Sequence, residues 1–506
     1  MKRLSAALVG GVSVLALALT GCSAAASPKA SSGGTLTVAT SYGPNSLAPG
    51  DLSGGGEGTY YWTPVFDTLL KTQPDGTPTP GLATKWSYNK SLTQLTLTLR
   101  KGIKFSDGEV LDAAAVEANI KHTQSGSGSD VSELAAVSQV HVPDSDTVVL
   151  DLKTQDPGLL RSLGGPAGAI GSPRSLTSKD VATSPVGSGP YVLDKSRTTN
   201  DAEYVYTRRP GAYWDAASWK YDTIVLKVTT DETARVNALN SGQVNAAYIL
   251  PPEAKQVTNA GNKILASPNG FSGLGIFDRE GKIQPAFKDV RVRQAINYAI
   301  DRKQILQATA LGYGKLSQQF FADGQLGHVD SLDKTYSYDV KKARSLMAAA
   351  GYANGFDITI PLIGSGNATT ALIQEALGKI NIRATYKTIA PTDIYSALFG
   401  GTYPMFLMGG GGGSWQLIKG DLMPDSIWNM LHASDPELTA LIATARKAPA
   451  DQQQEAFAAV NKWVVKNAWF DIMWQAESLY AVDSKTTAKT GGALDTPPLW
   501  TFAPAK

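Results

Sequence analysis

The side chains that could carry out catalysis do not form a known catalytic pattern. The chain contains no Gly-x-Ser-x-Gly elbow, His-Glu-x-x-His pair, phosphate loop or Gly-x-Gly-x-x-Gly fingerprint. Gly312-Tyr313-Gly314-Lys315 resembles the end of a phosphate loop, but Leu316 stands where such a loop needs Ser or Thr to hold magnesium. The plentiful acidic residues leave open a glycosidase pair, whose carboxylates would meet only in three dimensions. The sequence therefore favours binding over catalysis, with a secreted hydrolase as the alternative.

The sequence also offers no obvious ligand set for a metal. The single Cys rules out a disulfide framework and a thiolate metal cluster, each of which needs at least two sulfurs. The four His residues are dispersed and lack the i, i+4 spacing that would place two of them on one helix face. We therefore expect neither a metal nor another cofactor.

A run of five glycines, Gly409–Gly413, precedes Ser414 and Trp415. Such a run is commonly a loose surface loop, but it also lets the backbone approach a ligand closely, with Trp415 as an aromatic wall. Both interpretations stay open. For a second aromatic cluster, Tyr60–Trp62, we favour packing over ligand contact. Successive residues do not share one helix face, so we expect at least one of its rings to point away from the core.

The first residues are typical of an export signal. Two basic residues precede an apolar stretch, 6–19, which is shorter than the roughly 20 residues that span a bilayer. The stretch ends in Leu-Thr-Gly-Cys, which is similar to the bacterial lipoprotein cleavage box. We therefore expect a lipoprotein signal peptide over 1–21, a lipid attached to Cys22 and a flexible tether over 22–33. The mature protein would then be extracytoplasmic and anchored to the cell membrane by lipid.

Composition and charge indicate a large globular protein. The 506 residues include 46 Lys and Arg against 44 Asp and Glu, a formal charge of +2. Hydrophobic residues make up 42% and charged residues 18%, which argues against disorder. The balanced charge lacks the basic surface that neutralises phosphates, so we expect no nucleic-acid partner. The length suggests about three structural units.

Local patterns predict strands early in the chain and a mixed α/β arrangement later. Alternation of apolar and polar residues predicts strands at 35–40, 95–99, 147–152, 356–360 and 382–386. Asp289 and Asp339 would each cap a helix with an apolar face. A further helix is expected near 371–379, and Asp451 and Gln454 have capping-box spacing before another.

Several segments along the chain occur together, in the same order, in one protein family. These segments are 82–86, 96–108, 185–191, 208–214, 239–244, 287–302 and 338–352. The most specific is 287–302, with the sequence FKDVRVRQAINYAIDR. On these motifs the chain resembles the extracellular solute-binding proteins, family 5, of ABC importers for oligopeptides, dipeptides and nickel.

The resemblance implies an α/β fold of the periplasmic-binding-protein type, with two hinged lobes and an extra inserted α+β domain. By analogy, lobe I takes residues 34–63, 186–277 and 476–506, the inserted domain takes 64–185, and lobe II takes 278–475. Two chain crossings, near 270–278 and 472–480, would form the hinge. A solute would bind between the lobes and stabilise the closed form, since only closure lets both lobes contact it.

The resemblance also implies candidate contacts for the solute. Gly420-Asp421 resembles the segment whose carboxylate holds the free amino terminus of a peptide, and Glu57 resembles a second acidic contact from the opposite lobe. The candidate ligand-binding residues are Tyr42, Glu57, Phe271, Gly411, Gly412, Gly413, Trp415 and Asp421. Both acids also have the ordinary interpretation of solvated loop residues.

We therefore expect a substrate-binding lipoprotein of an ABC importer, with a short peptide as the leading ligand class. Its partners would be the solute and the permease and ATPase subunits, and it would act as a monomer and not as an enzyme. An oligosaccharide held by stacked aromatic rings is the alternative ligand, and nickel is disfavoured by the dispersed His residues. A ligand-presenting sensor on the same scaffold is an alternative role.

Overall fold

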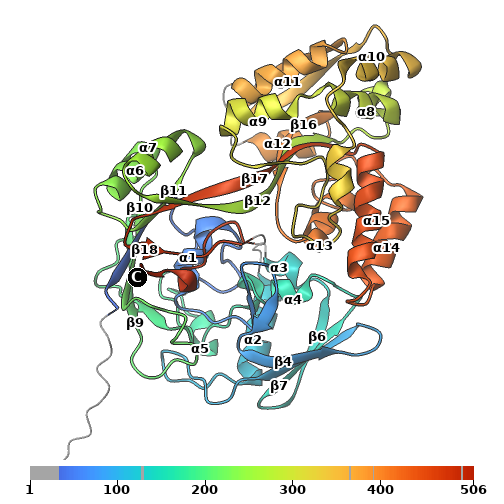
Figure 1. Ribbon diagram of the computed structural model, residues 1–506. Coiled ribbons are helices and arrows are strands. Elements are labelled where there is room, and N and C mark those ends of the chain that lie inside the picture. The colour runs from blue at the N-terminus through green and yellow to red at the C-terminus, as the bar shows by residue number, and fades with distance from the viewer. Residues whose placement is uncertain (1–32, 127–129, 364–365, 391–392, 492–493, 506) are drawn as a thin grey trace, which may run out of the picture.

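The computed structural model describes residues 33–126, 130–363, 366–390, 393–491 and 494–505. The predicted signal peptide, Cys22 and all of the predicted tether except its last residue lie outside the described residues. Figure 1 shows three bodies, which we call lobe I (around β9–β11 and α6), the inserted domain (around β4–β7 and α2) and lobe II (around α8–α15). The domain boundaries given above stay predictions.

A nine-stranded sheet runs through lobe I and into lobe II. Its strands are β1 (Thr35–Thr40), β8 (Tyr191–Leu193), β9 (Glu203–Arg208), β10 (Thr223–Val228), β11 (Ala246–Ile249), β12 (Lys263–Ile276), β13 (Lys315–Leu316), β16 (Met405–Gly410) and β17 (Phe470–Val482). The order is β16-β12-β17-β11-β1-β10-β9-β8, and β13 pairs with β17. β1 is parallel to β10 and β11, while the other pairs are antiparallel.

The long strands β12 and β17 join the two lobes as one antiparallel ribbon (Figure 1). β17 pairs with β11 at its lobe I end, and β12 pairs with β16 at its lobe II end. The register between β12 and β17 shifts between Pro268 and Phe271. Gly270 lies in this bulge with a φ of 72°, and a Cβ atom there would lie 1.7 Å from Gly410 O. The close approach and the left-handed backbone together require Gly at this position.

Lobe I packs short helices and the C-terminal segment against this sheet. Its helices are α1 (Thr59–Trp62), α6 (Glu232–Asn240) and α7 (Ala254–Asn259), and β18 (Thr486–Thr487) pairs with β19 (Ala503–Pro504). The three rings of Tyr60–Trp62 are all at most 4% exposed. The expectation that one ring would point away from the core is wrong, because α1 is packed on several sides: Tyr61 contacts Tyr204 of β9, and Tyr60 contacts Phe502.

The inserted domain is a four-stranded antiparallel sheet covered by helices. The sheet has the order β4 (Ala83–Tyr88), β5 (Gln94–Leu99), β7 (Thr147–Leu152) and β6 (Val137–Asp144). The other elements are the hairpin of β2 (Leu70–Thr72) and β3 (Pro78–Pro80) and the helices α2 (Ala113–Ser125), α3 (Asp130–Glu133), α4 (Leu159–Ser162) and α5 (Pro173–Leu176). The alternation in β5 is confirmed, since Leu95, Leu97 and Leu99 point into the core of this domain.

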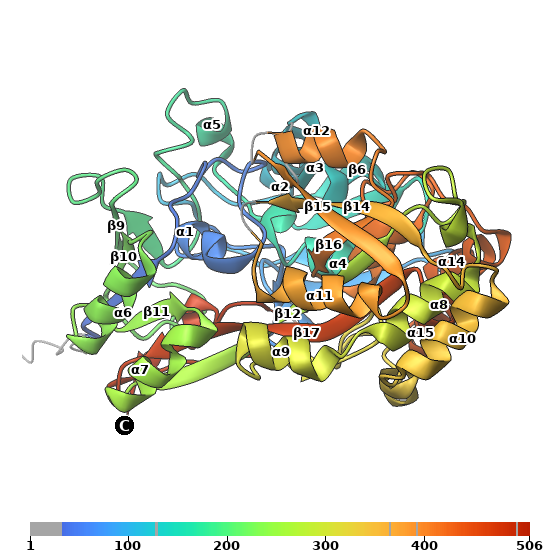
Figure 2. The same cartoon turned by 90° about the horizontal axis from the view of Figure 1, so that it is seen from above.

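Lobe II surrounds the other end of the ribbon with helices and a small parallel sheet. Its elements are α8 (Val290–Ala299), α9 (Arg302–Ala310), α10 (Val340–Ala349), β14 (Phe356–Ile363), α11 (Ala368–Gly378), β15 (Ile382–Ile389), α12 (Ile394–Phe399), α13 (Ser414–Leu417), α14 (Pro436–Lys447) and α15 (Gln453–Lys466). β14 and β15 form a parallel pair, as expected for a mixed α/β arrangement. Figure 2 shows the helices of lobe II and those of lobe I at opposite ends of β12 and β17.

The capping predictions in lobe II are confirmed at two helices and wrong at a third. Asp289 accepts a hydrogen bond from Arg291 N (2.8 Å) at the start of α8, and Asp339 accepts one from Lys342 N (2.9 Å) at the start of α10. At α15 the N-cap residue is Gln452, whose side chain makes no capping bond. Gln454 instead accepts a hydrogen bond from Gly327 N, because a loop of the same lobe packs on the helix start.

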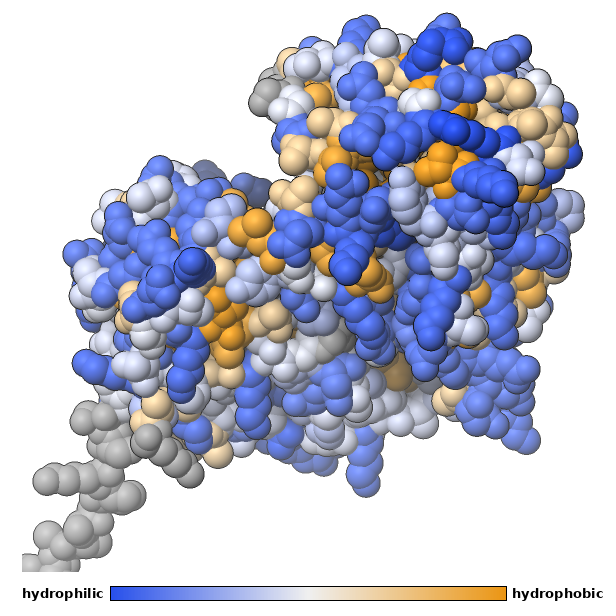
Figure 3. Space-filling view, turned by 45° about the horizontal axis from the view of Figure 1, so that its top comes forward, coloured by the Kyte–Doolittle hydropathy of each residue, from blue (hydrophilic) through white to orange (hydrophobic). Residues whose placement is uncertain are grey.

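The face of the molecule seen in Figure 3 is mainly hydrophilic. On this face, hydrophobic residues come to the surface around the indentation between lobe I and lobe II. Within the described ranges, no helix combines the length and the apolar character needed to cross a membrane.

Candidate functional site

A cavity of about 680 Å³ lies where lobe II faces lobe I and the inserted domain. Its volume is in the range of small-molecule binding sites. The facing walls include Gly54, Gly55, Asp75, Gly158, Arg161 and Asp495 on one side and Gln325, Gly411, Gly412, Gly413, Trp415 and Phe457 on the other. Pro268 and Gly270 of β12 also line the cavity, so it adjoins the bulge in the connecting ribbon.

The run of five glycines divides between a strand and the cavity wall. Gly409 and Gly410 end β16, where Gly410 pairs with Phe271 and leaves no room for a Cβ atom, which would lie 2.4 Å from the Phe271 ring. Gly411–Gly413 continue along the cavity to α13. Gly412 has a φ of 101°, a conformation that side chains disfavour. Lobe II therefore presents bare backbone to the cavity at this point.

Trp415 stands beside this backbone in α13. Its ring lines the cavity, is 5% exposed and packs edge-on against Phe457 of α15 at 6.2 Å. Gly158 of the inserted domain lies directly opposite, since a Cβ atom on Gly158 would be 2.9 Å from Trp415 Cδ1. The absence of a side chain at Gly158 therefore allows the inserted domain to approach lobe II.

The opposite wall carries the charged groups. Arg161 of α4 and Asp495 of the C-terminal segment both line the cavity, and so does Asp75 in the turn between β2 and β3. Burial raises the pKa of Asp495, which is partly offset by a hydrogen bond from Gly56 N (2.9 Å). Burial lowers the pKa of Arg161, while Glu133 and Asp495 act in the opposite direction. A guanidinium retains its proton in proteins, so the wall offers one cation and two acidic groups.

Asp75 differs from Asp495 because it is exposed. It accepts a hydrogen bond from Thr77 N (2.9 Å), and this bond lowers the pKa of the Asp75 carboxyl. Its carboxylate is therefore ionised at neutral pH and open to a cationic group in the cavity.

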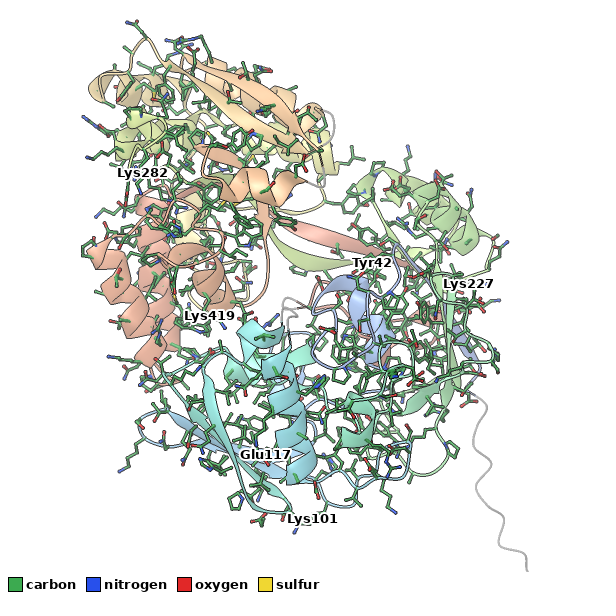
Figure 4. All side chains as sticks on the ribbon, turned by 180° about the vertical axis from the view of Figure 1, so that it is seen from behind. Tyr42, Lys101, Glu117, Lys227, Lys282 and Lys419 are labelled. Atoms are coloured by element: carbon green, nitrogen blue, oxygen red, sulfur yellow. The ribbon has the colours of Figure 1, made fainter. Side chains whose placement is uncertain are left out.

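An ion pair bridges the seam between the inserted domain and lobe II. Lys419 Nζ lies 3.7 Å from Asp156 Oδ2, and Figure 4 shows Lys419 where lobe II meets the inserted domain. Asp156 also accepts a hydrogen bond from Gly158 N (2.9 Å). Burial raises the pKa of Asp156, and Lys419 opposes that rise. The contact holds the two walls of the cavity next to each other.

Asp421 does not line the cavity in this structure. It is 4% exposed in a π-helical turn, Ile418–Leu422, and its Oδ1 atom has no hydrogen-bond partner in the described part of the chain. Burial raises the pKa of Asp421 to about 7, and the nearby guanidinium of Arg279 opposes the rise. Arg279 itself stacks on Trp469 at 3.9 Å and donates to Asn429 Oδ1. The contact between Asp421 and an ammonium group stays a prediction.

Glu57, Tyr42 and Phe271 are likewise not among the residues that line the cavity, although Phe271 directly follows the lining residue Gly270. Glu57 is 3% exposed and accepts a hydrogen bond from Ser41 N (2.8 Å), and its burial raises the pKa of its carboxyl. Tyr42 is exposed on lobe I (Figure 4), and its hydroxyl accepts a hydrogen bond from Gly58 N. Phe271 packs between Phe320 and Phe470 in the core of lobe II. Their contacts with a solute stay predictions.

Sequence reasoning did not select Arg161, Asp75 or Asp495. Asp75 stands in a Pro-Asp-Gly turn, which indicates a loop but not its position at a cavity. Arg161 and Asp495 belong to distant parts of the chain and meet only in the folded protein. No local pattern could have indicated them. Among the described residues, no group of three or more His, Cys, Asp and Glu side chains is placed to hold a metal ion.

The sequence matches a known family over most of its length. The model described as "Bacterial extracellular solute-binding proteins, family 5 Middle" matches residues 77–419. The chain belongs to the bacterial extracellular solute-binding proteins, family 5. The glutathione-binding protein GsiB of Salmonella paratyphi A is 32% identical over 300 residues, which cover 57% of this chain and 57% of GsiB. The match therefore spans just over half the length of that relative.

Solved structures establish the two-lobed fold. The ABC transporter substrate-binding protein CtaP from Listeria monocytogenes superposes with a TM-score of 0.81 at 21% identity, covering 94% of this chain and 100% of CtaP. The periplasmic binding protein DppA from Helicobacter pylori, in complex with the peptide STSA, superposes with a TM-score of 0.74 at 20% identity, covering 94% of this chain and 98% of DppA. These relatives are named as binding proteins and not as enzymes, in agreement with the prediction from the missing catalytic motifs.

Proposed function

We propose that this protein is the extracytoplasmic substrate-binding component of an ABC importer and that it captures a short peptide between its lobes. The observation that carries the proposal is the cavity of about 680 Å³, whose facing walls belong to lobe II on one side and to lobe I and the inserted domain on the other. A solute in this position contacts both sides at once, so its binding energy favours the closed arrangement. Family membership and the named relatives support the class of function.

The charges on the wall favour a peptide over a neutral solute. A peptide with free ends carries one carboxylate and one ammonium group, and the cavity offers Arg161 for the first and Asp75 or Asp495 for the second. The bare backbone of Gly411–Gly413 lies opposite and offers peptide groups to the main chain of the solute. Asp421 is the alternative ammonium anchor, and it would need to become exposed to the cavity and ionised.

A thermal-shift experiment tests this proposal. The protein is mixed with tripeptides that have free ends, with the same peptides amidated at the carboxyl end or acetylated at the amino end, and with oligosaccharides. A ligand at about 100 times its dissociation constant stabilises a protein by roughly 2.7 kcal/mol, which gives a clear melting shift. We expect a shift with free peptides and a much smaller one after either modification. Equal shifts with all peptide forms, or a shift only with oligosaccharides, would contradict the peptide assignment.

Lipid anchoring at Cys22 is part of the same proposal. The support is the Leu-Thr-Gly-Cys sequence at the end of the apolar stretch 6–19. Replacing the thiol, Cys22→Ser, should move the protein from the membrane fraction to the soluble fraction. Full membrane retention of this variant would contradict the anchor without affecting the solute-binding proposal.

The partners proposed for the loaded protein are the permease and ATPase subunits of the importer. The protein would act as a monomer, and its closed, loaded form would be the one that the permease recognises. ATP hydrolysis by the reconstituted importer should therefore rise only when the protein and its solute are both present. A rise without solute would contradict this role.

A further inference from the structure

A side pocket of about 120 Å³ opens beside the main cavity, between lobe I and the inserted domain. The two spaces share four lining residues: Gly54, Arg161, Leu494 and Asp495. The side pocket therefore adjoins the site proposed for the solute. Arg161 and Asp495 both stand where the two spaces adjoin.

Beyond these shared residues, large apolar side chains form much of the wall. Trp62 of α1 and Leu499 are buried, and Trp500 and Pro166 are partly buried around the same space. The indole N–H of Trp62 donates to Ser53 O (2.9 Å), so the polar atom of this ring is already satisfied. The apolar surface of the Trp62 ring is therefore available to contact a bound group.

The wall is held firmly because the C-terminal segment is tied to lobe I. The hydroxyl of Tyr60 donates to Pro497 O (2.8 Å), and Gly56 N donates to Asp495 (2.9 Å). These two bonds fix the segment on either side of Thr496. A preformed pocket of this kind does not have to be ordered when the guest enters.

The pocket also contains a polar atom that the protein leaves without a partner. The Oγ1 atom of Thr63, a lining residue, is buried and makes no hydrogen bond within the described residues. A buried hydroxyl without a partner is unusual, and it indicates a place where water or a guest group completes the hydrogen bonding.

We propose that this side pocket binds the side chain of the carboxyl-terminal residue of the solute and selects a branched aliphatic or aromatic side chain. This inference rests on the proposed function. With the terminal carboxylate on Arg161, the adjoining side chain stands at the shared entrance and can enter the pocket. An apolar cavity of about 150 Å³ accepts a benzene ring, so a space of about 120 Å³ suits a leucine or phenylalanine side chain.

Calorimetry with three tripeptides tests the inference: Gly-Gly-Gly, Gly-Gly-Leu and Gly-Gly-Phe. We expect Gly-Gly-Leu or Gly-Gly-Phe to bind about 10- to 100-fold more tightly than Gly-Gly-Gly, the usual effect of burying such a side chain. Binding of all three with equal affinity would overturn the side-pocket proposal and leave the proposed function standing. If none of the three tripeptides binds, the side-pocket proposal and the assignment of a peptide as the solute are both overturned.

The variant Gly54→Leu adds a side chain at the shared entrance. A Cβ atom at position 54 would lie 3.6 Å from Pro166 Cγ, an ordinary contact, so the chain can accept the change. We expect this variant to lose the preference for Gly-Gly-Leu and Gly-Gly-Phe over Gly-Gly-Gly, whatever the change in its affinity for Gly-Gly-Gly itself. Gly378→Leu, on an exposed position of α11 with open space around it, is the matched control and should keep the preference.

A second variant keeps the test decisive if Gly54→Leu does not fold. Trp500→Ala removes one wall of the pocket without closing it, and it should also reduce the preference for Gly-Gly-Phe over Gly-Gly-Gly. If Gly54→Leu and Trp500→Ala, where they fold, both keep the preference for the larger side chains, the side pocket does not select the side chain and the proposal is overturned.

Discussion

Two ion pairs show how differently this protein holds its interior and its seam. Within lobe II, Arg302 and Asp471 form a pair that is at most 5% exposed, and Arg302 also donates to Ile472 O (2.8 Å) and Asn297 O (2.9 Å). Across the seam, Lys419 and Asp156 are joined by one contact of 3.7 Å. The interior pair is embedded in a network, whereas the seam pair stands almost alone.

The contrast between these two ion pairs indicates which parts of the molecule can move relative to one another. A buried pair with several hydrogen bonds resists disruption, because removing one partner leaves an uncompensated charge. The seam pair is one long contact from a partly exposed Lys419, and Asp156 keeps its hydrogen bond from Gly158 N when the lysine is removed, so its loss is expected to cost less than that of the interior pair. Each lobe is therefore expected to behave as a rigid body, and the seam is expected to open at small cost. Four predictions test this contrast, from the largest effect to the smallest.

Breaking the interior pair should have the largest effect on stability. In Arg302→Met, Asp471 stays buried without its cation, and we expect the free energy of unfolding to fall by about 3–5 kcal/mol. Arg291→Met removes an exposed ion pair with Asp289 and should change it by less than about 1 kcal/mol. Denaturant titration measures both. Equal losses of unfolding free energy in the two variants would show that the interior pair contributes no more than an exposed one.

The second prediction concerns pH and the interior of the same lobe. Burial raises the pKa of Asp421 to about 7, so the folded state holds this proton more tightly than the unfolded chain, where the pKa is about 3.9. The resulting stabilisation is complete below about pH 4 and is lost as the pH rises through about 7. Relative to Asp421→Asn, we expect the wild-type protein to lose on the order of 2–4 kcal/mol across this window.

Melting curves from pH 4 to pH 8 check this dependence. The control is Asp425→Asn, on an exposed residue of the same segment, which should follow the wild-type protein at every pH. A constant difference between Asp421→Asn and the wild-type protein would show that Asp421 is ionised in the folded state throughout the range. That result would strengthen Asp421 as an anchor for an ammonium group.

A third prediction moves to the cavity wall. Arg161→Gln removes the cation proposed to hold the terminal carboxylate, and it should weaken binding of a free tripeptide about 10- to 100-fold, as expected for a lost charge-assisted hydrogen bond. Binding of the amidated peptide should hardly change. Arg174→Gln, on an exposed residue of the same domain, serves as the control. If Arg161→Gln weakened both peptide forms equally, the contact would be structural.

The smallest effect is expected at the seam. Lys419→Ala should lower solute affinity at most about fivefold, because the pair is one long contact from a partly exposed lysine and Asp156 keeps its hydrogen bond from Gly158 N. The unfolding free energy of the solute-free protein should fall by less than in Arg302→Met, and small-angle scattering should report a more open average shape. A loss of stability as large as that in Arg302→Met would show that the seam pair resists disruption as strongly as the interior pair.

The fold could be predicted where its determinants are local. Alternating residues placed β5 and β7, and Asp289 and Asp339 marked the starts of α8 and α10, because a strand face and a helix cap depend on neighbours in sequence. The capping prediction at Asp451 was wrong because Gln454 bonds to Gly327, a residue far away in sequence. Tertiary contacts override local patterns at such positions.

The site could be predicted only in part. For the glycine run and Trp415 the sequence left open a loose surface loop or a close approach of backbone to a ligand, and the structure places Gly411–Gly413 and Trp415 at the cavity. Asp421 came from a family pattern and lies buried beside Arg279. Arg161 and Asp495 come together only through the packing of the C-terminal segment on the inserted domain, and a sequence pattern does not encode that proximity.

The paired construction of β12 and β17 has a mechanical consequence. Two strands that are hydrogen-bonded along their length cannot slide past each other without breaking the ladder, but they can flex across the plane of the sheet, above all at the bulge around Gly270. The two strands should therefore allow the lobes to bend toward and away from each other, but not to rotate about the strand axis. The cavity between the lobes would open along a single direction. Its two walls would return to the same relative position each time the lobes close.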